Sequence, residues 1–134
     1  MKKLYFLVLS ISGLVFSFWL MWHTLSYNPT THTILVGGKY WSDFGGHLPQ
    51  IRSFSLGENW PWEYPTFPGE PTRYHMLFYF LVGQFERMGL RLDWALNVPS
   101  ALGFFFLCIM IWVTAYKFFR RYSVATLSVL FFLF

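Results

Sequence analysis

Cysteine and charged residues are both scarce in this sequence of 134 residues. The single cysteine, Cys108, lies inside an apolar run, so the chain offers neither a disulfide framework nor a cysteine metal site. Charged residues make up 12% of the chain, whereas an ordinary soluble domain has roughly a quarter. Hydrophobic residues make up 55%, aromatic residues 24%, and the mean hydropathy is +0.42. This composition is typical of a membrane protein.

The common motifs of soluble nucleotide and hydrolase chemistry are also missing. No Walker A, G-x-S-x-G or H-E-x-x-H pattern occurs, and the dipeptides Gly37-Gly38 and Gly45-Gly46 are better explained as turns or points of close backbone approach. The net charge of +4 does not indicate a nucleic-acid partner, because Lys and Arg form no basic stripe. We therefore expect no nucleic acid among the partners of this chain.

Two apolar segments, residues 4–22 and 94–116, are long enough to cross a bilayer as helices. A hydrocarbon core about 30 Å thick requires about 20 helical residues. The first segment is too long, and contains too much Trp, for the apolar part of a cleavable signal peptide. A third segment, residues 123–134, would be about 18 Å long and too short to cross. The sequence therefore predicts an all-α membrane protein with two full transmembrane helices plus the start of a third, as in an N-terminal fragment (residues 1–134) of a multispan domain.

The distribution of charge predicts which side of the membrane each segment faces. Basic residues near membrane helices are retained on the cytoplasmic side. The basic residues that flank the two spans without a nearby acid are Lys2, Lys3, Lys117, Arg120 and Arg121. All six acids lie between the spans: Asp43, Glu58, Glu63, Glu70, Glu86 and Asp93. We expect a multi-pass protein of the plasma (inner) membrane with a cytoplasmic N-terminus and an extracytoplasmic loop at residues 23–93, although Arg87 and Arg91 depart from this pattern.

The outer loop is predicted to carry two interfacial helices, near residues 43–56 and 74–88. In the first helix Ser42 can cap a start at Asp43, and Pro49 would kink or restart the helix. Beyond the proline, we expect Ile51, Phe54 and Leu56 to enter the membrane interface while Arg52 stays in water. In the second helix, the apolar stretch at residues 76–85 covers only about 15 Å, so it is expected to lie along the membrane surface.

Asp43 and His47 are the candidate catalytic residues, because an i, i+4 spacing stacks them on one helix face. A carboxylate there could act as a general base towards an acceptor hydroxyl, or hold a divalent cation such as Mg or Mn. His47 could orient that carboxylate, ligate the same metal, or donate to a phosphate oxygen. A capping acid beside a surface histidine is an equally good interpretation of the spacing.

The rest of the loop contains candidate substrate-binding residues. The stretch ENWPWEYPTFPGEP is rich in Trp, Tyr and Pro, which suits an extended segment at headgroup depth but also a surface for sugar rings. The side chains that could contact a substrate are Arg52, Glu70, Arg73 and His75. Arg73 is the best candidate for a phosphate contact, because a guanidinium can bind two oxygens at once. Helix-start chemistry and headgroup contact would explain Glu70, Arg73 and His75 equally well.

The order of these parts resembles the N-terminal portion of the GT-C fold. RYHMLFYFLVGQFERMGL precedes ALNVPSALGFFFLCIMIWVTAYKFFRRYSVATLSVL, after a basic N-terminus, one span and an outer loop with an early Asp. The GT-C superfamily contains the multispan glycosyltransferases, including the protein mannosyltransferases and the lipid A aminoarabinose transferases. The similarity covers nearly the whole chain. Its motifs are mostly apolar.

The resemblance implies a cell-envelope transferase that takes a sugar from a polyprenyl-phosphate-linked donor to an acceptor on the outer face. In that superfamily an acidic residue of the first outer loop is implicated in catalysis, and Asp43 matches it. A DE pair is common at that position in the mannosyltransferase branch, whereas Phe44 follows Asp43 here, so the resemblance does not specify a metal. The alternative is a non-catalytic multispan protein, such as a transporter half or an assembly subunit. The polar groups gather in the loop rather than in the spans, which favours the enzyme.

Overall fold

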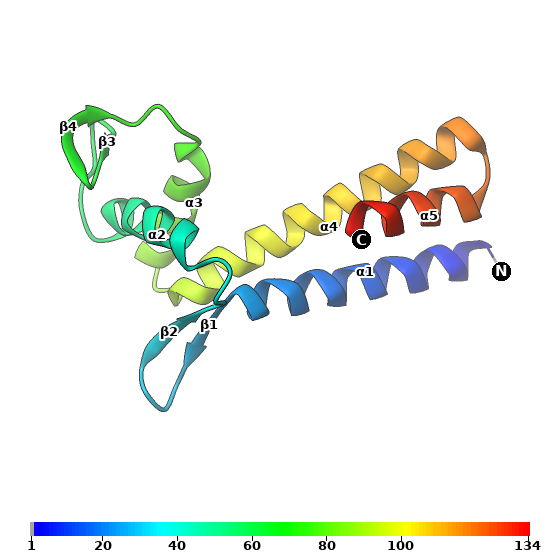
Figure 1. The fold of residues 1–134 in the computed structure, drawn as a ribbon, viewed down its shortest axis with the longest axis horizontal. Coiled ribbons are helices and arrows are strands. Elements are labelled where there is room, and N and C mark those ends of the chain that lie inside the picture. Colours follow the sequence, from blue (N-terminus) through cyan, green and yellow to red (C-terminus); the bar gives the residue numbers. More distant parts are fainter. Residues whose placement is uncertain (1) are drawn as a thin grey trace. The chain divides into compact units, whose positions relative to one another are not determined.

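The computed structural model describes residues 2–134. This part of the chain contains five helices and four short strands (Figure 1). Their order is α1 (Lys2–Thr24), β1 (Leu25–Asn28), β2 (Thr33–Val36), α2 (Trp41–Ser55), β3 (Glu63–Tyr64), β4 (Phe67–Pro71), α3 (Met76–Arg87), α4 (Leu92–Phe119) and α5 (Tyr122–Leu133). Residues 2–20 and 100–134 belong to one compact unit, and residues 21–99 form a second one. The chain is mostly helical, but the two strand pairs show that the all-α prediction is wrong in detail.

Two of the helices are long and apolar enough to cross a membrane. The apolar part of α1, Tyr5–Thr24, has 20 residues with a mean hydropathy of 1.8, and Leu92–Phe119 has 28 residues with a mean hydropathy of 2.1. Only 6% and 11% of their most apolar windows are buried, whereas the core helix of a soluble protein is mostly buried. The helix α5 has 12 residues, too few to cross a hydrocarbon core that requires about 20.

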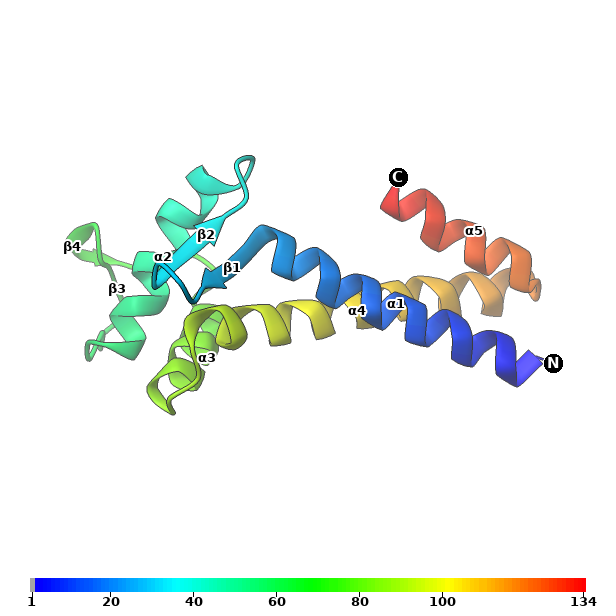
Figure 2. The same ribbon diagram turned by 90° about the horizontal axis from the view of Figure 1, so that it is seen from below.

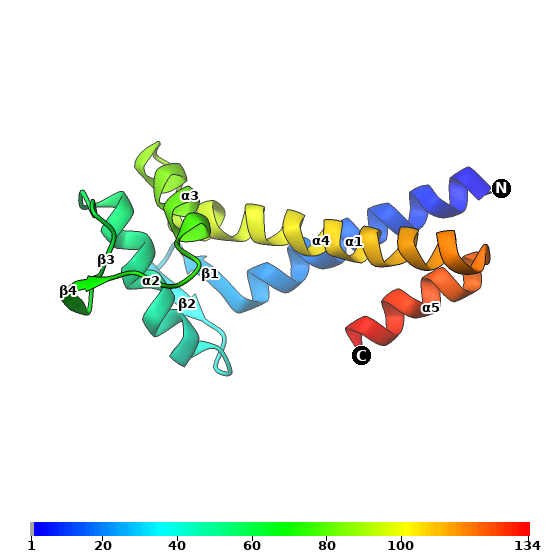
Figure 3. The same ribbon diagram turned by 90° about the horizontal axis from the view of Figure 1, so that it is seen from above.

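In the first unit, most contacts are apolar, but a few aromatic and hydroxyl side chains also form hydrogen bonds with one another. The Tyr5 hydroxyl lies 2.7 Å from Oγ1 of Thr126, and Trp112 Nε1 donates to the same oxygen at 3.3 Å. The rings of Phe6 and Trp112 also pack, with centroids 5.1 Å apart. Between α4 and α5 the chain turns sharply at Arg120, whose φ of 55° is in the left-handed region (Figure 3). These contacts hold α5 against α4 and the first turns of α1.

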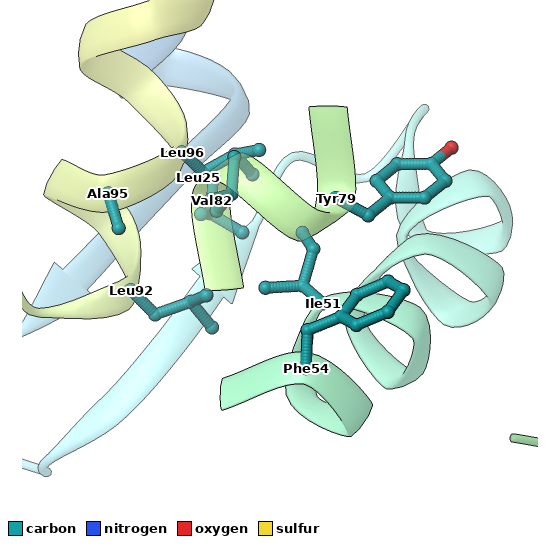
Figure 4. Close-up of a cluster of buried hydrophobic side chains, with 8 residues drawn as sticks. All are labelled: Leu25, Ile51, Phe54, Tyr79, Val82, Leu92, Ala95 and Leu96. Carbon is teal, nitrogen blue, oxygen red and sulfur yellow. The ribbon is translucent and has the colours of Figure 1, made fainter. Parts of the chain in front are cut away.

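The second unit has a small hydrophobic core. Its buried side chains come from β1, α2, α3 and the first turns of α4, and are Leu25, Ile51, Phe54, Tyr79, Val82, Leu92, Ala95 and Leu96 (Figure 4). Ile51 and Phe54 are 0% and 4% exposed, so the expectation that they enter the membrane interface is wrong. The helix α3 covers the face of α2 from which they project, and only Leu56, at 77% exposed, remains outside.

The helix α2 begins earlier than the sequence predicts. It starts at Trp41 after Tyr40, which makes no capping hydrogen bond through its side chain, so Ser42 is not the cap of a helix that starts at Asp43. Asp43 instead lies in the first turn, where the helix dipole favours a negative charge. Pro49 lies within the helix, which continues to Ser55.

The loop before α2 and the loop after it each contain a hairpin that the sequence did not predict. β1 pairs antiparallel with β2, with Leu25 opposite Val36 (Figure 2). The buried amide of Asn97 donates to the Leu25 carbonyl at 2.7 Å, and the guanidinium of Arg91 lies 4.3 Å from the Tyr27 ring centroid. Arg91 also binds the buried Asp93 through two hydrogen bonds, of 2.6 and 2.8 Å, which raise the pKa of the guanidinium. Residues 58–71, which the sequence predicts to be a simple extended segment, instead contain the β3–β4 hairpin.

Gly83 lies where α2 and α3 approach most closely. A Cβ at this position would come within 2.7 Å of the Phe54 Cβ and 3.0 Å of the Ile51 carbonyl oxygen. Because one neighbour is backbone, the helices would have to separate to make room. We expect Gly83→Ala to reduce the free energy of unfolding by about 1–3 kcal/mol, measured by thermal unfolding of the purified protein. Gly45→Ala in α2 is the matched control, since a Cβ there meets nothing within 4 Å, and an equal loss of stability in both variants would contradict the helix-contact argument.

Candidate functional site

A hollow of the second unit lies between α2, the β3–β4 hairpin and the start of α3. Its volume is about 420 Å³, within the range of small-molecule sites. The lining side chains are aromatic, proline, amide, hydroxyl and imidazole groups, and none of them carries a formal charge at neutral pH when the histidine is neutral. The lining consists of Gly46, His47, Pro49, Gln50, residues 64–67, Thr72, Tyr74 and Tyr79.

His47 and Tyr79 form a hydrogen-bonded pair at this cavity. The Tyr79 hydroxyl lies 2.6 Å from His47 Nδ1, and the two ring centroids are 5.3 Å apart. Tyr79 projects from α3 with its ring against the core and its hydroxyl directed away from the other core side chains (Figure 4). Burial, with smaller contributions from Tyr74 and Tyr64, raises the pKa of Tyr79, so the phenol stays protonated at neutral pH. The pair therefore occupies Nδ1 and leaves Nε2 as the imidazole nitrogen that can contact a ligand.

Gln50 supplies a second fixed polar group in the cavity. Its side chain is 4% exposed, and its amide nitrogen donates to Oγ1 of Thr72 at 3.1 Å. This bond connects α2 to the segment between β4 and α3. The amide oxygen of Gln50 makes no hydrogen bond among the described residues. A ligand hydroxyl could therefore donate to it.

Asp43 is exposed and lies one helical turn before His47. Within residues 2–134 its carboxylate makes no hydrogen bond or ion pair, so it is available to a substrate proton or a cation. The neighbouring Phe44 is partly buried and packs against the core cluster. An acid at position 44 would lose solvation there, which gives a physical reason why Asp43 stands without a second acid beside it.

The four predicted substrate-binding residues lie outside the lining of the cavity. Arg52 pairs with Glu86 of α3 at 3.0 Å, and the Glu86 side chain is only 11% exposed. Glu70 and Arg73 are exposed, in β4 and after it, and have no hydrogen bond or ion pair among the described residues. His75 precedes α3, with its ring centroid 4.4 Å from that of Tyr74. Arg73 and His75 therefore flank cavity residues in the sequence, whereas Arg52 holds α2 against α3.

The sequence interpretation missed Gln50, Thr72, Tyr74 and Tyr79 as members of the site. Tyr79 lies in the apolar stretch that is expected to lie along the membrane surface, and its partner His47 is 32 residues away in the chain. The sequence feature that could have indicated Tyr79 is its phenol within an apolar helix, because a buried Tyr hydroxyl usually requires a hydrogen-bond partner.

A metal ion at this site would need additional ligands from outside the protein. Within residues 2–134 no three His, Cys, Asp or Glu side chains gather in a cluster that could hold an ion. Asp43 and His47 could supply two ligands at most. Mg²⁺ usually keeps several waters and binds through one or two carboxylates together with substrate phosphates, so a cation here would depend on the substrate for its remaining contacts.

The resemblance to the GT-C glycosyltransferases is a prediction from the sequence pattern alone. Comparison of the chain with protein-family models, curated proteins and solved structures gives no match. The function has to be inferred from the chemistry of this site and from the two long apolar helices.

Proposed function

We propose that this chain is a membrane glycosyltransferase, or part of one, that transfers a sugar from a polyprenyl-phosphate-linked donor to an acceptor on the outer face of the membrane. In this proposal α1 and α4 cross the plasma membrane, the N-terminus is cytoplasmic, and residues 23–93 lie outside. Support comes from the length and low burial of the two helices, and from the position of all six acids between them.

The observation that carries the proposal is the cavity with its His47–Tyr79 pair and Asp43 one turn away. A donor with a lipid tail presents its reactive carbon at headgroup depth, so its catalytic groups belong on helices at that depth. The exposed apolar side chains of α3 support such a position: Leu77, Phe78, Phe80 and Leu81 are 71%, 36%, 40% and 42% exposed.

In this mechanism Asp43 removes the proton from the acceptor hydroxyl. The hydroxyl oxygen attacks the anomeric carbon, a new carbon–oxygen bond forms, and the bond from that carbon to the phosphate oxygen breaks. The lipid phosphate leaves with both bonding electrons. His47 contacts the departing phosphate through Nε2, while Arg73 can bind two of its oxygens. In the alternative role, Asp43 would hold a divalent cation that neutralises the same phosphate charge, and it would then not act as the base.

Turnover of a lipid-linked sugar tests the proposal directly. We expect the full-length protein, reconstituted in liposomes with a labelled polyprenyl-phosphate sugar and an envelope extract as acceptor source, to release free lipid phosphate and to label the acceptor. The free lipid phosphate is measured by chromatography. If no lipid-linked sugar is consumed while the protein co-purifies with a stable partner, a non-catalytic assembly subunit is the correct interpretation.

The proposed orientation can be tested with cysteine labelling in intact cells. We expect Ser42→Cys, in a Cys108→Ser background, to react with a membrane-impermeant maleimide added outside, because residue 42 is exposed and the loop is proposed to be extracytoplasmic. Lys117→Cys, in the last turn of α4, at the end proposed to face the cytoplasm, is the matched control and should react only after permeabilisation. The reverse pattern would place the loop in the cytosol and contradict transfer on the outer face.

A further inference from the structure

The cavity between α2, the β3–β4 hairpin and α3 has a chemistry that selects among sugars. We propose that it binds an uncharged pyranose ring and discriminates against amino sugars and uronic acids. This inference rests on the proposed function, because it assigns the sugar substrate of the same site. The ring could belong to the donor or to a sugar acceptor, and the two sources share the same chemistry.

The volume of the cavity fits one ring. The volume of about 420 Å³ is within the range of sites that bind small molecules. The cavity is suited to the single sugar next to the bond that is formed or broken.

The walls offer flat apolar surfaces for the carbon–hydrogen faces of a pyranose. Phe67 and Tyr74 are 67% and 53% exposed at the rim, and the Tyr74 ring is nearly parallel to that of Tyr79, at an interplanar angle of 20°. Pro49 and Pro65 add further apolar surface. Aromatic rings often line small-molecule sites, and a ring-shaped ligand fits the position of these side chains.

The polar groups of the cavity are few and held in place. Gln50 is fixed by its bond to Thr72, and His47 by its bond to Tyr79. The Gln50 amide oxygen accepts a hydrogen bond, and His47 Nε2 either donates or accepts, depending on the tautomer. Sugar hydroxyls can match both, because each hydroxyl donates and accepts.

The absence of charge in the lining gives the selectivity. No Asp, Glu, Lys or Arg lines this cavity within the described residues. An ammonium or carboxylate on the part of the ring inside the lining would lose water without gaining a charged partner there, which costs more than the burial of a hydroxyl. A second hollow of about 240 Å³ in the same unit is lined in part by Glu58, Trp60 and Arg87, so its lining contains charged side chains.

Three glycosides with the same ring and different charge test the inference. We would measure their binding to the full-length protein in nanodiscs by saturation-transfer NMR at a pH of about 7. The probes are methyl α-D-glucopyranoside, its 2-amino-2-deoxy analogue and its uronic acid. We expect the uncharged glycoside to bind at least about tenfold more tightly than either charged one. Equal or tighter binding of a charged glycoside would overturn the inference.

Two variants locate the binding in this cavity. We expect Tyr74→Ala and Gln50→Leu each to weaken binding of the uncharged glycoside at least about tenfold, and Trp60→Ala, which lines the second hollow, to leave it unchanged. Tyr74 is half exposed, so its removal is compatible with folding even if Gln50→Leu is not. Unchanged binding in Tyr74→Ala, or an equal loss in Trp60→Ala, would refute the assignment.

Competition distinguishes the source of the ring and separates this inference from the proposed function. Displacement of the glycoside by a polyprenyl-phosphate-linked glucose identifies the donor sugar, whereas simultaneous binding of both identifies an acceptor sugar. Glycoside binding without any sugar transfer would leave the inference intact and refute the glycosyltransferase. Transfer without selective binding in this cavity would refute the inference alone.

Discussion

Replacement of Asp43 by Asn is expected to reduce sugar transfer about a hundredfold or more while insertion and accumulation remain normal. Asn has nearly the same shape as Asp but cannot accept a proton from the acceptor hydroxyl, and the loss of a general base typically costs 10²–10⁴-fold in rate. The fold should tolerate the change, because the Asp43 side chain is exposed and contacts no charged partner in residues 2–134. The measurement is the initial rate of transfer from a labelled lipid-linked sugar in liposomes.

Glu58→Gln is the matched control for this variant. Glu58 is an exposed acid that follows α2, and this variant undergoes the same change from carboxylate to amide. We expect its transfer rate to stay within about twofold of the unmodified protein, since exposed substitutions away from a site have small effects. Full activity of Asp43→Asn, or an equal loss in both variants, would remove Asp43 from the mechanism.

Replacement of His47 by Gln is expected to lower kcat about tenfold to a hundredfold. Gln keeps hydrogen-bonding groups but does not supply an imidazole nitrogen that is held by Tyr79 and directed to the substrate. We expect Tyr79→Phe to give a smaller loss in kcat, because it removes the 2.6 Å hydrogen bond but keeps the imidazole and the packed ring. The measurement is kcat and KM for the lipid-linked donor, together with the pH profile of kcat.

His32→Gln provides the control for His47. His32 is exposed in the turn of the β1–β2 hairpin, where it also contacts a tyrosine hydroxyl, at 2.7 Å from Tyr27. The same chemical change there should leave kcat unaltered. If His47→Gln retained full kcat with an unchanged pH profile, the His47–Tyr79 pair would have a structural role only.

Local pattern was sufficient to predict several features of this chain. The two long helices follow from apolar runs that exceed the thickness of a bilayer, and both α1 and α4 contain the predicted segments. The two helices of the loop, α2 and α3, overlap the predicted ranges 43–56 and 74–88. The placement of Asp43 and His47 one turn apart also depends only on helical spacing.

Contacts between distant residues could not be predicted in the same way. Ile51 and Phe54 have the spacing of an apolar helix face, which suits lipid and a protein neighbour equally well, and only the position of α3 distinguishes the two. The strands β1 and β2 are four residues each, too short for a clear alternation of apolar and polar residues. The close contact at Gly83 depends on the path of α2.

By itself the sequence determined the apolar helices, the scarcity of charge and the turn that carries Asp43 and His47, because these depend on composition and on short-range helical geometry. The tertiary structure alone decided which aromatic residues form the site. It brought Tyr79 to His47 and Thr72 to Gln50, pairs separated by 32 and 22 residues. The physical reason is that hydrogen bonds and packing depend on distance in space, and the approach of α2 to α3 sets those distances.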